Sequence, residues 1–236
     1  MKIGIITDIH NNIVALDAVL KAFEDACCDR VICCGDIIGI GPRPEETVSR
    51  LMSVPNLTCV RGNHESYLLD GIPGPDKMPE TEARHHEWEH DQLSPHSKAF
   101  LAALPSEAEL TVNGIKIYAA HYALDSQSRF APLSPRPTLW DCQRMFHYVD
   151  ADIILFGHDH AACLFQTGKT KYCNCGSLGC PMRDKSIARA GILIISGRNT
   201  RFEPLHISYD TDQVLADIDR LHYPAAEEIK KIFFGM

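Results

Sequence analysis

The sequence predicts an α/β protein made of a single domain over residues 1–236. Its first third alternates short apolar strands with helices, which indicates parallel strands joined by right-handed crossovers. Strands dominate again later in the chain, and an Asn113–Gly114 pair marks a hairpin turn between two of them. A chain of 236 residues is long enough for one sizeable core with a modest insertion.

The elements of the first third follow from their end signals. Strands are expected at 2–7, 30–34 and 56–60. Asn11 or Asn12 is a suitable N-cap for a helix that ends near residue 26. Pro44, followed by two glutamates, suits the first turn of a second helix, because the positive end of the helix dipole favours acidic side chains.

Residues from about 66 to 105 lack the strand–helix alternation of the first third and are predicted to form an inserted helical cap. A loop rich in glycine and proline leads into helices at about 80–91 and 95–104. After the insertion the pattern predicts further strands and helices. The strands are at 109–112, 115–120, 153–156, 163–167, 171–173, 191–196 and 201–208, and the helices follow Thr138 and occupy about 211–221 and 225–233.

Composition and charge argue against several classes of protein. The net charge is -8 and there is no long basic run, so polymeric nucleic acid is not an expected partner. A small phosphorylated substrate remains compatible, since bound cations can reverse the local charge. The apolar run at 3–6 is too short for a signal peptide and no stretch approaches a membrane span. We therefore expect a cytoplasmic protein with ten reduced cysteines and no membrane partner. The sequence is compatible with a monomer and with a homo-oligomer.

Five polar clusters each follow an apolar strand. They are Asp8-Ile9-His10, Gly35-Asp36, Gly62-Asn63-His64-Glu65, His121 and Gly157-His158-Asp159-His160. Ligands of open α/β sheets bind beyond the carboxyl ends of the strands, so the clusters are expected to meet at one rim. Each cluster alone also has a structural interpretation, such as a capping aspartate or a turn with a left-handed asparagine. The recurrence of all five after strands favours a common site.

These side chains form a mixed nitrogen and oxygen ligand set. Such a set suits Mn, Fe, Co, Ni or Zn rather than the all-oxygen sites of calcium and magnesium. Seven candidate ligands exceed the needs of one tetrahedral zinc ion. They suffice for two divalent metal ions that share a carboxylate.

The five clusters closely resemble those of the calcineurin-like metallophosphoesterases, most of all their small bacterial and archaeal phosphodiesterase branch. That branch also carries an Asn-x-Gly-Ser-x-Gly-x-Pro segment, which matches residues 174–181 here. The resemblance extends over essentially the whole chain. It implies a four-layer α/β/β/α sandwich of two mixed sheets with a small helical cap.

The resemblance also implies a role for each matching residue. The implied ligands are Asp8, His10 and His160 for the first ion, and Asn63, His121 and His158 for the second, with Asp36 bridging the two. His64 is implied to contact the phosphate and to protonate the leaving group, without binding metal. The implied reaction is hydrolysis of a small phosphodiester, such as a nucleotide, by a hydroxide held between the two ions.

Three residues depart from the family pattern. Tyr122 follows His121 where glycine is usual, and it would narrow the pocket, stack on a base or simply pack. Met182 precedes Arg183, which leaves a phosphate contact by Arg183 open. Asp159 replaces a common threonine, and it would add charge near the metals or cap a loop. Asp159 and Glu65 are also candidates for orienting a ligand imidazole.

The cap contains His85, His86, His90 and His96. Helical spacing places His86 and His90 on one face, where they would line the substrate entrance. Ordinary exposed histidines are the alternative, and a third metal site is disfavoured.

Three functions of the protein are considered. A phosphodiesterase is the leading hypothesis, and a phosphomonoesterase, including a phosphoprotein phosphatase, would use the same metal core. A non-catalytic scaffold is disfavoured because every ligand position of the motifs is intact.

Overall fold

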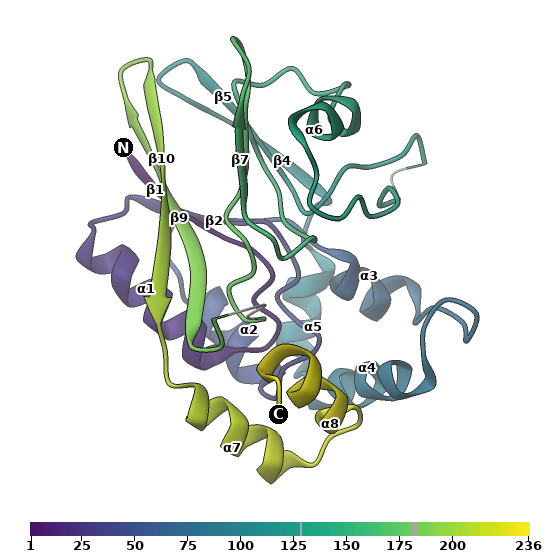
Figure 1. Ribbon diagram of the computed structural model, residues 1–236. Coiled ribbons are helices and arrows are strands. Elements are labelled where there is room, and N and C mark those ends of the chain that lie inside the picture. Colours follow the sequence, from purple (N-terminus) through teal and green to yellow (C-terminus); the bar gives the residue numbers. More distant parts are fainter. Residues whose placement is uncertain (128, 181–183) are drawn as a thin grey trace.

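The computed structural model describes residues 1–127, 129–180 and 184–236. Within these ranges the strands form two five-stranded sheets that pack face to face. Helices cover both outer faces, with α1 and α6 on opposite sides of the sheet pair (Figure 1). This arrangement confirms the predicted four-layer α/β/β/α sandwich. In the described part of the chain, no helix combines the length and apolar character needed to cross a membrane.

The first sheet joins the strands of the N-terminal third to a C-terminal hairpin, in the order β10-β9-β1-β2-β3. Its strands are β1 (Lys2–Ile6), β2 (Arg30–Cys33), β3 (Leu57–Cys59), β9 (Ile187–Ser196) and β10 (Asn199–Ser208). β1, β2 and β3 are parallel, as the strand-helix alternation predicts, whereas β9 pairs antiparallel with β1 and β10. The parallel strands therefore end at one edge of the sheet.

The second sheet has the order β4-β5-β6-β8-β7. Its strands are β4 (Glu107–Val112), β5 (Ile115–Ala120), β6 (Ile153–Leu155), β7 (Cys163–Gln166) and β8 (Lys171–Asn174). The predicted hairpin joins β4 to β5, with Asn113 at φ 52° and Gly114 at φ 76°, both left-handed as a tight primed turn requires. β5, β6 and β8 are parallel and end beside the loops of the first sheet.

Helices α1 (Ile13–Asp25), α2 (Pro44–Met52) and α7 (Thr211–Leu221) cover the first sheet, and α6 (Leu139–Met145) covers the second. Asn12 is the cap of α1, since its Oδ1 accepts the Ala15 N–H at 3.0 Å. The buried stripe of α1 includes Leu16 and Phe23. A Cβ on Gly4 of β1 would lie 2.5 Å from the Phe23 ring, so glycine permits this close helix–sheet contact.

Two cap helices were predicted, and they are α4 (Glu80–Gln92) and α5 (Pro95–Ala102). A further helix, α3 (Asn63–Asp70), precedes them and was not predicted. The Glu65 carboxylate accepts the Gly62 N–H at 2.6 Å and stabilises the first turn of α3. The glycine- and proline-rich loop begins at Gly71, as predicted. The predicted C-terminal helix is α8 (Ala226–Ile229), which continues as a π-helix, η1 (Lys230–Phe234).

Candidate metal centre

The five predicted clusters lie together at the carboxyl ends of the parallel strands. Asp8 and His10 follow β1, Asp36 follows β2, Asn63 begins α3 after β3, His121 follows β5, and His158 and His160 follow β6. The two sheets meet here, since the His121 Nδ1–H donates to the Cys34 carbonyl oxygen at 2.8 Å. Residues up to 152 positions apart in the chain therefore surround one small volume.

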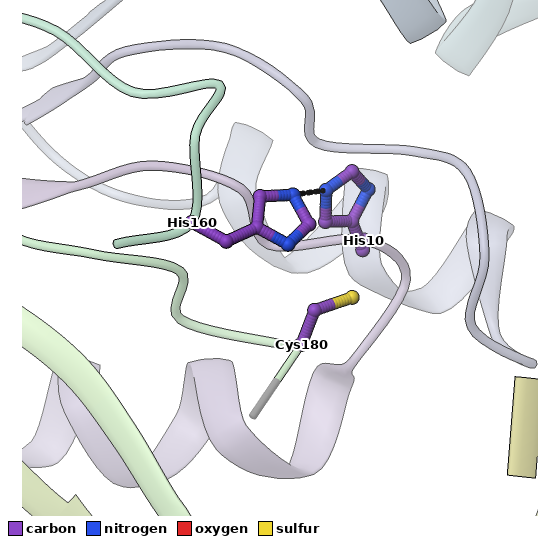
Figure 2. A group of neighbouring side chains, drawn as sticks. All are labelled: His10, His160 and Cys180. Atoms are coloured by element: carbon purple, nitrogen blue, oxygen red, sulfur yellow. Dashed lines mark hydrogen bonds between the residues drawn. The ribbon is translucent and has the colours of Figure 1, made fainter. Parts of the chain in front are cut away.

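Four side chains form the first half of the centre. His10 Nε2 lies 3.0 Å from His160 Nε2 (Figure 2), 3.9 Å from Asp8 Oδ1 and 3.8 Å from Asp36 Oδ2. His160 Nε2 is in turn 3.6 Å from Asp8 Oδ1. These are the side chains that the resemblance assigned to the first ion, together with the bridging aspartate.

The second half is built around His121. Its Nε2 lies 3.2 Å from Asp36 Oδ2, 3.1 Å from Asn63 Oδ1 and 3.1 Å from His158 Nδ1. The Asn63 Nδ2 donates to the Tyr67 hydroxyl at 3.3 Å, which turns Oδ1 toward His121. Asp36 Oδ2 thus belongs to both halves.

The donor set fits a pair of divalent cations. Because the Nδ1–H groups of His10 and His121 donate to the carbonyls of Ile38 and Cys34, each ring in its neutral form presents its Nε2 as an acceptor. Each Nε2 faces further acceptors at about 3 Å, a contact that only a shared cation or proton makes favourable. Ligands that bind one ion at about 2.0–2.2 Å have this mutual spacing.

The pKa values of the ring nitrogens reflect this crowding. Burial lowers the pKa of His10 and of His158 to about 4. Burial also lowers that of His121, but the charge and hydrogen bond of Asp36, together with Asp8 and the Cys34 carbonyl, outweigh it and raise the pKa of His121 to about 10. A divalent cation at His121 would therefore displace a proton, and metal loading should strengthen as pH rises.

The backbone at the ligands is unusual. Asp8, His10, Asp36, His158 and His160 have positive φ values of 52°, 49°, 51°, 73° and 57°. Asp and His tolerate the left-handed region better than most residues, although each such residue still costs roughly 1–3 kcal/mol. This conformation requires strong support from the surrounding structure, as expected at a functional site.

Residues 1–197 match the model of the calcineurin-like phosphoesterase superfamily domain. The chain belongs to this superfamily. It is 28% identical over 244 residues to an uncharacterised protein of Methanocaldococcus jannaschii, across 94% of this chain and 93% of that one.

Two solved structures share the fold of this metallophosphoesterase. One is a metallophosphoesterase from Sphaerobacter thermophilus, with 21% identity, a TM-score of 0.76, and coverage of 99% of this chain and 98% of that chain. The other is a hypothetical protein from Pyrococcus horikoshii, with 17% identity, a TM-score of 0.83, and coverage of 98% and 97%. The superfamily binds divalent metals and hydrolyses phosphoesters, and the His/Asp groups of this chain suit such ions.

The Glu65 carboxylate supports the loops of the metallophosphoesterase centre rather than an imidazole. It accepts the N–H groups of Asp36 at 3.0 Å, Ile37 at 2.8 Å, Ile38 at 3.1 Å and Gly62 at 2.6 Å. It thereby fixes the loop after β2 to the start of α3. Burial and the nearby Asp36 raise the pKa of Glu65 to about 7, against these hydrogen bonds.

Glu65→Gln is expected to lower the free energy of unfolding by at least about 2 kcal/mol, because two buried N–H groups would face an amide NH₂ at about 1–3 kcal/mol each. Urea denaturation of the metal-free protein measures the loss. The exposed Glu24 on α1 offers a matched control, Glu24→Gln, whose stability should not change. Equal stability of the two variants would contradict a supporting role for Glu65.

The segment that matches the family's Asn-x-Gly-Ser-x-Gly motif holds the other ligand loops. Ser177 Oγ donates to the Asp8 carbonyl at 2.9 Å, and the Ser177 N–H donates to the His160 carbonyl at 3.1 Å. A Cβ on Gly179 would lie 1.8 Å from the Ile9 carbonyl oxygen, so only glycine fits. The segment thus ties the loop after β1 to the loop after β6.

Two site residues escaped the prediction from sequence. Cys180 offers a sulfur within 4.8 Å of ligand nitrogens of His10 and His160 (Figure 2). Glu89 of α4 is buried and accepts from Asn11 Nδ2 and the Gly39 N–H, on the loops after β1 and β2. A glutamate in a polar helix carries no local sign of burial, and the Glu89–Asn11 contact spans 78 residues.

One alternative for the cap histidines was that they are ordinary exposed side chains. Three of the four are not exposed. His85 and His86 are buried, His90 is half-buried, and His96 alone of the four is exposed. His86 Nδ1 donates to Glu89 Oε2 at 3.2 Å, and its ring centroid lies 5.1 Å from that of His64. His86, Glu89 and His90 offer atoms within 4.8 Å of one another, but both Glu89 oxygens already accept from protein donors.

The departures from the family pattern have structural explanations where they are described. Tyr122 is fully buried, packs 4.9 Å from the His158 ring, and its hydroxyl accepts the Ser134 N–H at 2.9 Å, so it has a packing role. Asp159 Oδ2 accepts the Arg136 N–H at 3.0 Å and thereby holds a neighbouring loop. Arg183 lies outside the described residues.

Proposed function

We propose that this phosphoesterase is a phosphodiesterase that hydrolyses a small phosphorylated compound, such as a nucleotide, with two divalent cations. The observation that carries the proposal is Asp36 Oδ2, which faces His10 Nε2 at 3.8 Å and His121 Nε2 at 3.2 Å. A carboxylate between two nitrogen-rich groups suits a bridged pair of ions. When bound, such ions supply an activated water and offset charge on the phosphoryl oxygens.

In this proposal His64 acts on the leaving group. The backbone N–H of His64 donates to Asp36 Oδ1 at 3.1 Å. Its ring Nε2 lies 3.8 Å from Asp36 Oδ2, at the edge of the centre. Burial holds the pKa of His64 well below its usual value, against the charge of Asp36. An anionic phosphate beside the ring would raise that pKa and favour the imidazolium that protonates the departing oxygen.

A diester is supported by two cavities that adjoin the centre. One, of about 430 Å³, is lined by His160 together with Arg136 and Arg189. The other, of about 290 Å³, is lined by His64. A phosphate at the centre therefore has room for one substituent in each cavity, and the two arginines of the first cavity suit an anionic one.

The test compares a phosphodiester with the corresponding phosphomonoester, bis(4-nitrophenyl) phosphate against 4-nitrophenyl phosphate. We expect metal-dependent turnover of the diester, lost on chelation and restored by Mn²⁺ or another divalent ion of the predicted set. Turnover of the monoester alone would replace this proposal by a phosphomonoesterase. No turnover of either ester by a fully metal-loaded protein would favour a non-catalytic scaffold.

A further inference from the structure

A cavity opens beside His64, between the cap and the C-terminal end of the chain. Its walls come from α4 and from α8 with η1, which lie next to each other (Figure 1). The volume is about 290 Å³, and the residues that matter here are Ile40, His64, His85, His86, Ile232 and Phe233. π-Helical turns such as η1 are rare in proteins, and those that occur are often found at functional sites.

We propose that this cavity binds the alcohol portion of the substrate and selects an uncharged aromatic group of about nucleobase size. The inference rests on the phosphodiesterase function proposed above and identifies which alcohols that reaction releases. The cavity adjoins His64, the residue that would protonate the departing oxygen, so its occupant is the group attached to that oxygen.

The size of the cavity fits one ring system. A dry cavity of about 150 Å³ suffices to bind benzene. This one, at about 290 Å³, has roughly twice that volume and accommodates a bicyclic ring but no oligomer.

The charges around the cavity disfavour an anion. Its ionised lining groups are Glu82 and Glu228, both exposed and therefore at the rim, and no lysine or arginine is among its described lining residues. Ile232, with 67% of its surface exposed, and Phe233 supply apolar surface on the opposite wall. A second phosphate would meet two carboxylates and apolar side chains, without a cation.

The imidazoles of His85 and His86 are buried behind the cavity wall and add little polar surface to it. Burial lowers the pKa of His85 to about 4, so this ring is neutral near pH 7. His86 Nδ1 donates to Glu89 Oε2 at 3.2 Å, and its Nε2 is buried and not accessible to an occupant. An occupant therefore contacts mainly apolar surface, which favours an uncharged aromatic group.

The test uses two aryl methyl phosphates that differ only in a meta substituent, a neutral carboxamide or an anionic carboxylate. The wild-type enzyme should prefer the carboxamide ester in kcat/KM by at least about tenfold, because the carboxylate loses its hydration beside rim acids. The Glu82→Gln, Glu228→Gln double variant should reduce this preference by about threefold, since exposed charges interact weakly. Equal kcat/KM for the two esters in the wild type would overturn the proposal.

Thr81→Trp fills the cavity from the exposed start of α4 and should lower kcat/KM for the carboxamide ester by about tenfold, the effect of about 1.4 kcal/mol. The matched control, Thr111→Trp, lies at an exposed position on β4 and should match the wild type. Both variants should keep the metal content of the wild type. An unchanged kcat/KM in Thr81→Trp would contradict the assignment of the cavity.

A binding measurement separates failure of this inference from failure of the phosphodiesterase proposal. The free alcohol, 3-hydroxybenzamide, should give saturation-transfer NMR signals with the wild-type protein and none with Thr81→Trp. This result supports the cavity even if no diester is hydrolysed. Diester hydrolysis together with no binding signal in the wild type would overturn the cavity assignment and leave the phosphodiesterase in place.

Discussion

Asp36→Ala is expected to remove metal from both halves of the centre and to lower kcat/KM by at least about 10³-fold. The reason is geometric. Asp36 Oδ2 faces nitrogens of both halves, and Asp36 Oδ1 accepts the His64 N–H at 3.1 Å. If Asp36 bridges two ions, one substitution removes a ligand from each of them and also the acceptor of the His64 backbone N–H. Elemental analysis after dialysis gives the metal content, and diester hydrolysis gives kcat/KM.

Asp76→Ala is a suitable control for this variant, because Asp76 is exposed in the loop before α4 and is not one of the side chains of the centre. It should retain the metal content and activity of the wild type. Retention of two full equivalents of metal by Asp36→Ala would show that Asp36 does not bridge the ions. Loss of a single equivalent would assign Asp36 to one half.

His64→Ala is expected to keep the metals while lowering kcat by about 10²–10⁴-fold. The loss should be largest for poor leaving groups, because an alkoxide needs a proton more than a nitrophenolate does. A plot of log kcat against the leaving-group pKa should therefore be steeper for the variant than for the wild type. The exposed His147, whose ring Nδ1 donates to the Arg144 carbonyl, provides the control His147→Ala.

The alternative role of His64 is ligation of the first ion. His10, Asp36 and His64 offer atoms within 4.8 Å of one another, so the geometry includes a third grouping beside the two halves of the centre. If His64 were a ligand, His64→Ala would lose metal and its activity would fall equally for all leaving groups. That pair of results would remove the acid role from the mechanism.

The sequence alone predicted most elements of the fold because their signals are local. Asn12 was one of two predicted caps for α1, the Asn113–Gly114 turn joins β4 to β5 as expected, and Pro44 opens α2. The exception is α3, for which no helix was predicted. Its helical start depends on Glu65, whose carboxylate also binds N–H groups of the loop after β2, up to 29 residues earlier.

The sequence also indicated which side chains would meet. Polar residues that follow parallel strands share an edge, because the carboxyl ends of such strands lie together. The structure brings all seven candidate ligands and His64 to that edge, and their roles as ligands and acid stay predictions for the variants above. No local pattern indicated that Cys180 would lie beside His10 and His160.

Only the tertiary structure decided what surrounds the centre. Tyr122 packs instead of lining a pocket, Glu89 reaches from the cap to the loop after β1, and Phe233 lies 6.2 Å from the His160 ring. Each of these contacts joins elements far apart in the chain, so spacing along the sequence carries no information about them. Strand and helix periods determine which face a residue occupies, whereas the packing of distant faces against one another determines which cavities remain open.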